Sequence, residues 1–356
     1  MEKYIKNLKI LVNKNNNLKP GLFSGNMGLC FSLYLINKVV HDEEIEMMAG
    51  NLLDKVINSI ITMKDPSFAN DLCGIGWAIN YLHMNKCIEG DIDDILYNID
   101  AIIYRKLHNH QEAVNVDFGD GLIGYLTYIT FRLMNDEHKE DNLQKQLNEA
   151  TLRAVVDKME LVMPSRIPML SKDLYPSLLW EFPILFYCLG KVMKLGLYKE
   201  KICSMYGEWS YLLTCILPYL NINRLAVANS LAFSNSLIKN QPIDSYIDTL
   251  FYSVDFNSYI QEIRKDSVVL CGDWFYAILN SCMAMNLMKK EHVRYSELEN
   301  TYKKVLDLYN KNVDGTLCKI EETMPNVTLI NGYSGALLVY SLIKNVFIND
   351  NVKLLI

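Results

Sequence analysis

Apolar residues recur at intervals of three and four along almost the whole chain, as in LLDKVINSIITM (52–63) and IDDILYNIDAIIYRKL (92–107). This spacing is typical of amphipathic helices. Alternating patterns that would predict strands are scarce, and several prolines stand at the expected helix junctions. The pattern therefore predicts an all-α protein. No Gly/Ser-rich linker divides the sequence, so we expect a single domain over residues 1–356.

A repeat is the strongest signal in this pattern. Each copy has a short stretch of small and polar residues followed by an apolar run, as in FSGNMGLCFSLYLI from Phe23 and LINGYSGALLVYSLI from Leu329. Related segments begin at residues 68, 117, 178, 225 and 269. Their spacing fits one helical hairpin per copy. About seven hairpins are too many for a small bundle, and they predict an α/α toroid whose inner helices start around a common mouth.

A residue type that favours helix N-caps precedes the first small position in six of these segments. Short polar side chains at such positions accept hydrogen bonds from the unpaired N–H groups of the first helical turn. The glycines that follow let neighbouring backbones approach closely. We therefore predict that six side chains cap the inner helices: Ser24, Asn70, Asp120, Asn229, Asp273 and Asn331.

Composition and charge exclude several classes of partner and location. The chain has a net charge of −6 and no strongly basic stretch, so nucleic acid is not expected as a partner. No apolar run is long enough to predict insertion into a membrane. The N-terminal residues are charged and rich in asparagine, unlike a signal peptide, which predicts a cytoplasmic protein. The nine cysteines stand singly, so reduced thiols are expected rather than disulfides.

Repeated G-x-x-G-type motifs at the inner helices of such a ring resemble the lanthionine synthetase C-like family. The resemblance covers essentially the whole chain and rests on the repeat and its spacing. It implies a cyclase that adds a cysteine thiol of a precursor peptide to a dehydrated residue of the same peptide. The resemblance also implies a zinc ion that activates the thiol. This zinc would be held by one cysteine in the penultimate repeat and by a Cys-His pair in the last repeat.

This sequence departs from that pattern. Ile330 and Asn331 occupy the positions of the Cys-His pair, and Gly272 occupies that of the other cysteine, with Cys271 one residue out of register. Isoleucine cannot bind a metal, and an amide is a poor zinc ligand. Cys271 is then the only residual metal candidate, and we predict that no zinc is bound. Asn229 stands where the family has a histidine.

Only one proton-handling residue of the family finds a match here, Asp117, which is the catalytic candidate. In the ring, the motif loops would bring several carboxylates to one mouth and attract a cationic peptide. The candidate ligand-binding residues are Asp71, Asp120, Asn229, Asp273, Trp274 and Asn331.

Three functions are compatible with these residues. The first is a zinc-less member of the family that binds a peptide or a partner protein in lanthipeptide-type peptide modification. The second is a zinc-independent cyclase that still forms thioethers. The third is a hydrolase on the same ring, using Asp117 paired with Asp71 or Asp273. Whether any enzymatic activity remains is left open by the sequence.

Overall fold

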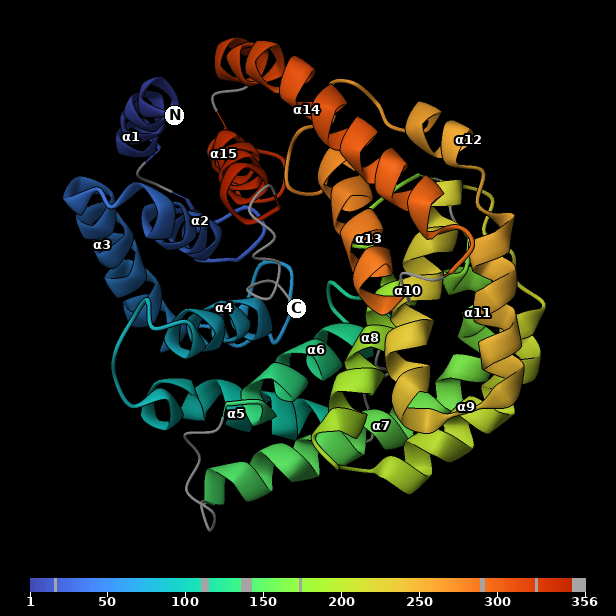
Figure 1. Ribbon diagram of the computed structural model, residues 1–356. Helices are drawn as coiled ribbons and strands as arrows, with labels where there is room; N and C mark the ends of the chain where they lie inside the picture. Colours follow the sequence, from blue (N-terminus) through green and yellow to red (C-terminus); the bar gives the residue numbers. More distant parts are fainter. Residues whose placement is uncertain are drawn as a thin grey trace. The chain divides into compact units, whose positions relative to one another are not determined.

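The computed structural model describes residues 1–15, 18–109, 115–135, 143–172, 175–288, 292–323 and 326–347. Within these ranges every regular element is a helix, which confirms the all-α prediction (Figure 1). The chain divides into two compact units. Unit 1 comprises Met1–Val162 and Thr323–Ser341, and unit 2 comprises Met163–Glu322 and the chain from Leu342 onward. The single-domain expectation stays a prediction.

Unit 1 contains the first helical hairpins. The helix α2 packs against α3, α4 packs against α5, and α4 lies between α2 and α6. The long helix α7 begins in this unit and continues beyond Val162. The bounds are α2 (Asn26–Val40), α3 (Glu43–Ile60), α4 (Leu72–Met84), α5 (Ile92–His108), α6 (Leu122–Leu133) and α7 (Leu143–Leu170).

The two ends of unit 1 form a further helix pair. The helix α15 (Tyr333–Leu342) contacts α1 (Glu2–Lys14), which lies at the other end of the chain. The Tyr333 hydroxyl donates a hydrogen bond to the carbonyl of Tyr4 at 3.3 Å. The ring of Tyr340 meets that of Tyr4 edge-on at 5.9 Å. The first helix of the chain therefore partners the last inner helix.

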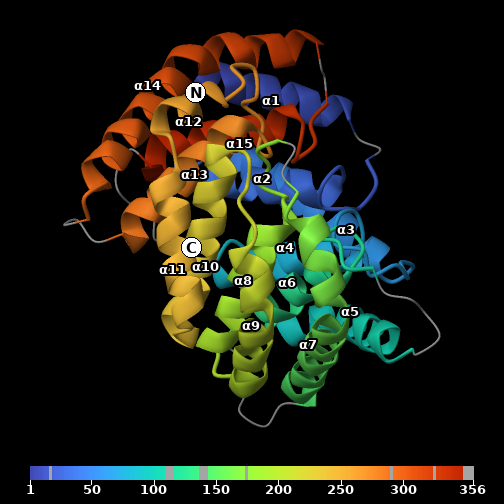
Figure 2. The same ribbon diagram turned by 90° about the vertical axis from the view of Figure 1, so that its right-hand side faces the viewer.

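Unit 2 repeats the hairpin arrangement. The helix α10 contacts α8, α11, α12 and α13, and α9 contacts α8 and α11, which Figure 2 shows side by side. The bounds are α8 (Glu181–Lys194), α9 (Lys199–Thr214), α10 (Asn221–Ile238), α11 (Gln241–Ser253), α12 (Phe256–Gln261), α13 (Asp273–Leu287) and α14 (Tyr295–Thr323), with a π-helical turn at Ile343–Phe347.

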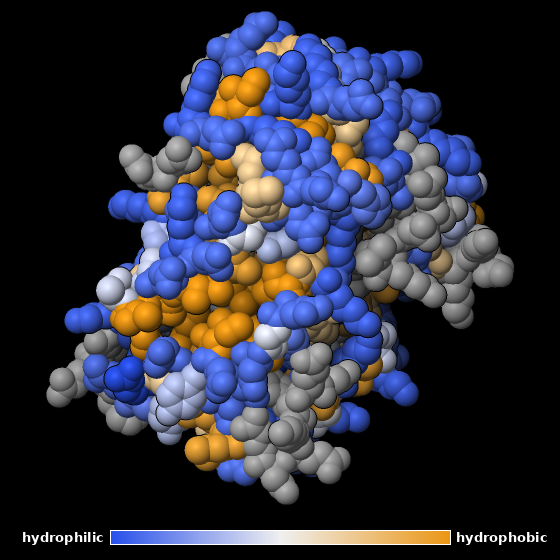
Figure 3. All heavy atoms as spheres, turned by 90° about the vertical axis from the view of Figure 1, so that its left-hand side faces the viewer, coloured by the Kyte–Doolittle hydropathy of each residue, from blue (hydrophilic) through white to orange (hydrophobic). Residues whose placement is uncertain are grey.

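In the described part of the chain, seven helices are buried on nearly all sides, as the apolar runs predicted. They are α2, α4, α6, α8, α10, α13 and α15. The other helices are amphipathic and cover them. Apolar side chains also reach the surface, where Met47 and Ile61 are 64% and 79% exposed. Figure 3 shows apolar areas between hydrophilic ones on one face of the molecule.

A buried ion pair joins outer and inner helices of unit 1. Asp100 on α5 accepts hydrogen bonds from Arg132 and Tyr128 on α6 and from Gln144 on α7. Asp100 and Arg132 are 1% and 0% exposed. Burial raises the pKa of the Asp100 carboxyl, against the opposing effect of Arg132 and its hydrogen bonds. Each polar group of this cluster depends on the others, because an unpaired charge is costly in the core.

The predicted side-chain caps are wrong. Ser24, Asp120 and Asn331 lie outside the helices that follow them, and no side-chain cap bond is found at α2, α4, α6 or α13. Asn70 accepts hydrogen bonds from the N–H and hydroxyl of Ser24 instead. Asn229 lies in the middle of α10, which begins at Asn221. Its segment lacks the glycines that mark the other helix starts, so the alignment there was shifted along the helix.

Backbone carbonyls perform the capping. The first N–H groups of α4 and α6 donate to carbonyls seven residues earlier, from Leu72 to Asp65 at 3.2 Å and from Leu122 to Asn115 at 2.9 Å. The same bond joins Tyr333 to Asn326 at the start of α15 at 2.8 Å. The loop before each of these three helices therefore folds back over the first turn. This satisfies the unpaired N–H groups that the sequence assigned to polar side chains. At α10, by contrast, the first N–H groups donate to the Glu262 carboxylate.

That fold-back explains the glycines of the motif. A Cβ atom on Gly28, Gly74 or Gly124 would lie 1.9, 1.9 and 2.4 Å from the carbonyl oxygen six residues before it. Only a residue without a side chain leaves room for the returning loop. The glycine repeat is thus a steric requirement of the loop.

Candidate functional site

The motif loops of unit 1 are hydrogen-bonded to one another. The N–H of Ile330 donates to Phe23, that of Phe23 donates to Ala69, and that of Ala69 donates to Gly119, at 3.3, 2.8 and 3.1 Å. These bonds join the loop before α15 to the loops before α2, α4 and α6. The last motif and the first three therefore share one loop cluster, as the repeat predicted for this part of the chain.

Three predicted carboxylates belong to this loop cluster. Asp117 accepts a hydrogen bond from the N–H of Asp120 at 2.6 Å. Burial, followed by the charges of Asp65 and Asp120, raises the pKa of Asp71, which only the more distant charge of Lys19 opposes. Asp120 is exposed and Asp71 and Asp117 are half-buried. The structure thus brings Asp71, Asp117 and Asp120 together and adds Asp65, which the sequence analysis missed because it precedes the aligned motif.

An aromatic cluster lies on the same inner helices. The ring of Trp77 on α4 is 5.5 Å from those of Phe31 and Tyr81 and 5.8 Å from that of Phe131. Trp77, Tyr81 and Phe131 are half-buried. The repeat register contained this signal, because Phe31 and Trp77 occupy equivalent positions in successive copies. The carboxylates of the loops before α4 and α6, here called the acidic loop cluster, are therefore followed by helices that carry partly exposed aromatic rings.

In unit 2, Asp273 does not present a free carboxylate. It is 0% exposed, and the Arg264 guanidinium donates to both of its oxygens at 2.9 and 2.8 Å. The Arg264 N–H and the Ser267 hydroxyl complete its partners. The expected unpaired charge at this position is wrong, because Arg264 stands nine residues before Asp273 and outside the aligned motif.

The other predicted residues of unit 2 are also enclosed. Trp274 is 2% exposed, and its Nε1 donates to the carbonyl of Lys265 at 3.2 Å. Asn229 is buried, and its Nδ2 donates to the carbonyl of Asn280 at 2.8 Å. Burial raises the pKa of the Cys271 thiol to about 12, so this sulfur is protonated at neutral pH. Asn229 and Trp274 therefore have structural roles within unit 2.

The two remaining positions of the expected zinc site lie in unit 1. Asn331 is exposed and Ile330 half-buried in the loop that precedes α15. Among the residues described, no three His, Cys, Asp or Glu side chains are grouped as metal ligands would be. None of the helices in those residues has the length and apolarity to cross a membrane.

Both a family model and a solved structure resemble this chain. Residues 3–163 match the family model described as lanthionine synthetase C-like protein. Among solved structures, nisin cyclase matches with a TM-score of 0.69 and 12% identity, over 97% of this chain and 95% of that chain. Over residues 3–163 the chain is similar to the lanthionine synthetase C-like family. Its likeness to nisin cyclase shows the α/α toroid fold predicted from the repeat. No curated protein sequence matches the chain.

The residues at the positions of the family's metal ligands do not fit a zinc site. The family positions for the metal ligands hold Ile330, Asn331 and Gly272, none of which supplies a thiolate or an imidazole. The neighbouring Cys271 supplies at most one sulfur ligand. A catalytic zinc needs three protein ligands, so these donors cannot reproduce the family site.

Proposed function

We propose that this protein is a zinc-less lanthionine synthetase C-like protein that binds a peptide or a partner protein in lanthipeptide-type peptide modification. One observation carries the proposal: Ile330 and Asn331 replace the Cys-His pair expected in the last repeat. The fold is kept, with its seven inner helices and their glycine-dependent loops, while the metal-binding chemistry is not. Nisin cyclase, by its name, acts on the peptide nisin, which supports a peptide as the ligand here.

The acidic loop cluster supports a cationic peptide as this ligand. Asp65, Asp71, Asp117 and Asp120 belong to loops that start α4 and α6. Burial and, after it, the charges of Asp65 and Asp120 raise the pKa of Asp71, and a Lys or Arg side chain of a bound peptide would offset that repulsion. Asp117 uses one carboxylate oxygen for the N–H of Asp120, so we assign ligand contact to its other oxygen. The half-buried ring of Trp77, which contacts Phe68 of the loop before α4, offers an apolar contact for the same peptide.

The metal is tested first. Elemental analysis of the purified protein, before and after dialysis against zinc chloride, is expected to find no stoichiometric zinc. A model peptide with one dehydroalanine and one cysteine is expected to keep an alkylatable thiol after incubation with the protein. One zinc per chain that is lost in Cys271→Ser would overturn the proposal, and so would thiol loss that depends on the protein.

Peptide binding is tested by fluorescence anisotropy with a labelled peptide of lysine, leucine and serine. Asp71→Asn/Asp117→Asn is expected to weaken binding by about tenfold, because two charge-assisted contacts are lost. The matched control is Asp54→Asn/Asp94→Asn, which removes the same charge at two exposed positions of unit 1. Equal weakening in both pairs would contradict a specific site and indicate attraction by net charge alone.

A further inference from the structure

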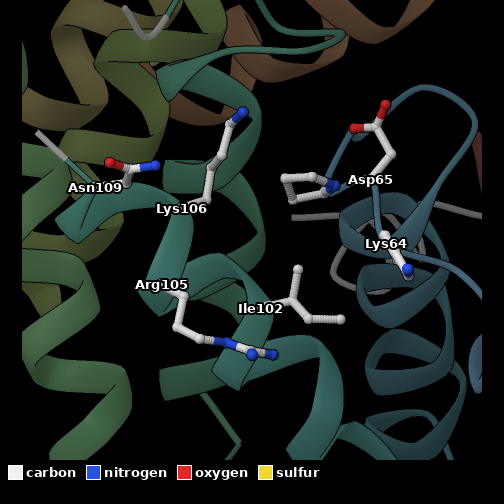
Figure 4. A pocket seen from close by; sticks show the side chains of 7 residues that line it. Lys64, Asp65, Ile102, Arg105, Lys106 and Asn109 are labelled. Atoms are coloured by element: carbon white, nitrogen blue, oxygen red, sulfur yellow. The ribbon is translucent and has the colours of Figure 1, made fainter. Parts of the chain in front are cut away.

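A cavity lies in unit 1, beside the loop that precedes α4. It has a volume of about 660 Å³ and lies between α5 and the loop that follows α3 (Figure 4). Its walls are Ile102, Arg105, Lys106 and Asn109 on one side and Lys64, Asp65 and Pro66 on the other. This volume is in the range of sites that enclose a ligand.

One face of α5 forms the first wall. Ile102, Arg105 and Lys106 are spaced i, i+3 and i+4, so they line one side of its last two turns, and Asn109 follows directly after the helix. Cations at a helix C-terminus are stabilised by the helix dipole, which by itself accounts for Arg105 and Lys106. It does not account for Lys64, which comes from a separate loop and adds a third positive charge to the same cavity.

The opposite wall is held in place by hydrogen bonds. The carbonyl of Asp65 accepts the N–H of Leu72 at 3.2 Å, and its Oδ1 accepts the N–H of Ser67 at 3.1 Å. The Ser67 hydroxyl donates to Gly119 at 3.2 Å. The one carboxylate of the cavity is thus engaged by its own loop, and the wall that carries Lys64 is preorganised.

Positive charge remains available in the cavity. Within the described ranges, Lys64 and Arg105 have no carboxylate partner. The Nε of Arg105 donates to the carbonyl of Ala101 at 3.2 Å, which leaves its two terminal nitrogens for a ligand. Three cations against one carboxylate contrast with the net charge of −6 of the whole chain. The ligand that matches this cavity is therefore an anion.

We propose that this cavity docks an acidic segment of a peptide. Carboxylates of the peptide pair with Arg105 and Lys64, since a guanidinium binds a carboxylate with two parallel hydrogen bonds. An apolar side chain of the same peptide packs on Ile102 and Pro66. A free phosphate ion would gain nothing from these apolar walls. The identity of the ligand as a peptide rests on the proposed function, whereas its charge rests on the cavity alone.

The test uses fluorescence anisotropy with a labelled peptide of glutamate, leucine and serine and the full-length protein. Lys64→Gln/Arg105→Gln is expected to weaken binding of this probe by about tenfold. The matched control Lys55→Gln/Lys311→Gln removes the same charge at two exposed positions and is expected to change affinity by no more than about twofold. A probe with glutamine in place of glutamate is expected not to bind.

Three results would overturn the proposal. One is equal weakening by both pairs of substitutions, and another is binding of the glutamine probe at the affinity of the glutamate probe. The third is displacement of the acidic probe by inorganic phosphate at an ionic strength at which sodium chloride has no effect, which would identify a phosphate site. Circular dichroism confirms that the variants are folded. Because the lysine peptide and zinc report on the proposed function separately, failure of one proposal is distinguishable from failure of the other.

Discussion

A Cβ atom on Gly74 would lie 1.9 Å from the carbonyl oxygen of Phe68, which lies in the loop that folds back onto α4. The carbonyl oxygen belongs to the backbone, so it cannot move aside as the end of a flexible side chain can. We expect Gly74→Ala to lower the free energy of unfolding by about 3 kcal/mol or more, measured by urea denaturation.

The control for this substitution is Gly207→Ala on α9. A Cβ atom there meets nothing within 4 Å, so alanine is expected to stabilise the helix by about 0.5–1 kcal/mol. If both variants lose the same stability, the steric explanation of the repeat glycines fails.

Asn331→Ala is expected to change the free energy of unfolding by less than about 0.5 kcal/mol, because its side chain is exposed and caps no helix. Asp42→Ala provides the contrast, since Asp42 accepts the N–H of Ile45 at the start of α3. Loss of that cap is expected to cost about 1 kcal/mol. A loss at Asn331 as large as that at Asp42 would restore the capping role predicted from the sequence.

Arg264→Gln is expected to lower the free energy of unfolding by about 2 kcal/mol, because it leaves Asp273 buried without its ion-pair partner. The two remaining donors, the N–H of residue 264 and the hydroxyl of Ser267, limit the loss. Thermal unfolding of Arg166→Gln, an exposed arginine without a carboxylate partner in the described residues, gives the baseline. Equal midpoints for the two variants would contradict this assignment.

The pH dependence of stability is expected to have opposite signs at Asp71 and Asp42. The pKa of Asp71 is raised, so the folded protein holds this proton more tightly than the unfolded chain, and ionisation of Asp71 destabilises the fold. Asp71→Asn is therefore expected to be more stable than the wild type at pH 7. This advantage should shrink as the pH falls through the raised pKa and vanish below about pH 4.

Asp42 is the reverse case. Its pKa is lowered, chiefly by the hydrogen bond from Lys9, so its stabilisation is present above the unfolded pKa and is lost as the pH falls through the folded value. Asp42→Asn is expected to be less stable than the wild type at pH 7, with a difference that fades in acid. Urea midpoints of both variants and the wild type, measured between pH 3 and pH 8, check both predictions. If the two substitutions change stability at pH 7 in the same direction, one of the two pKa assignments is wrong.

The repeat made most of the fold predictable. The spacing of Gly28, Gly74 and Gly124 marked the starts of three inner helices, because a close backbone contact leaves the same trace in each copy. The caps were not predictable from residue type, since the carbonyls that bind the first turn belong to the backbone and can come from any residue. Asn229 was misplaced because α10 begins without a glycine.

The candidate site was predictable only in part. Asp71, Asp117 and Asp120 were found through the repeat register, and unit 1 does bring them together. The partner of Asp273 was missed because Arg264 lies on the connection that follows α12, outside any repeated motif. No sequence motif marks the residues that line the cavity beside α5. Lys64 and Arg105 are far apart in the sequence, and only the folded chain places them on facing walls.

The pairing of α1 with α15 affects how the chain can be made. Unit 1 is made of two segments that are separated by Met163–Glu322 of unit 2. During synthesis, α1 therefore emerges long before its partner α15 has been translated. During that interval the apolar side of α1, with Leu8 and Leu11, has no α15 to cover it. Contacts separated by more than three hundred residues, such as that between Tyr4 and Tyr333, form slowly because of their loop-closure entropy. Completion of unit 1 is therefore a late step that follows synthesis of the main segment of unit 2, and until then the apolar side of α1 is open to non-native contacts.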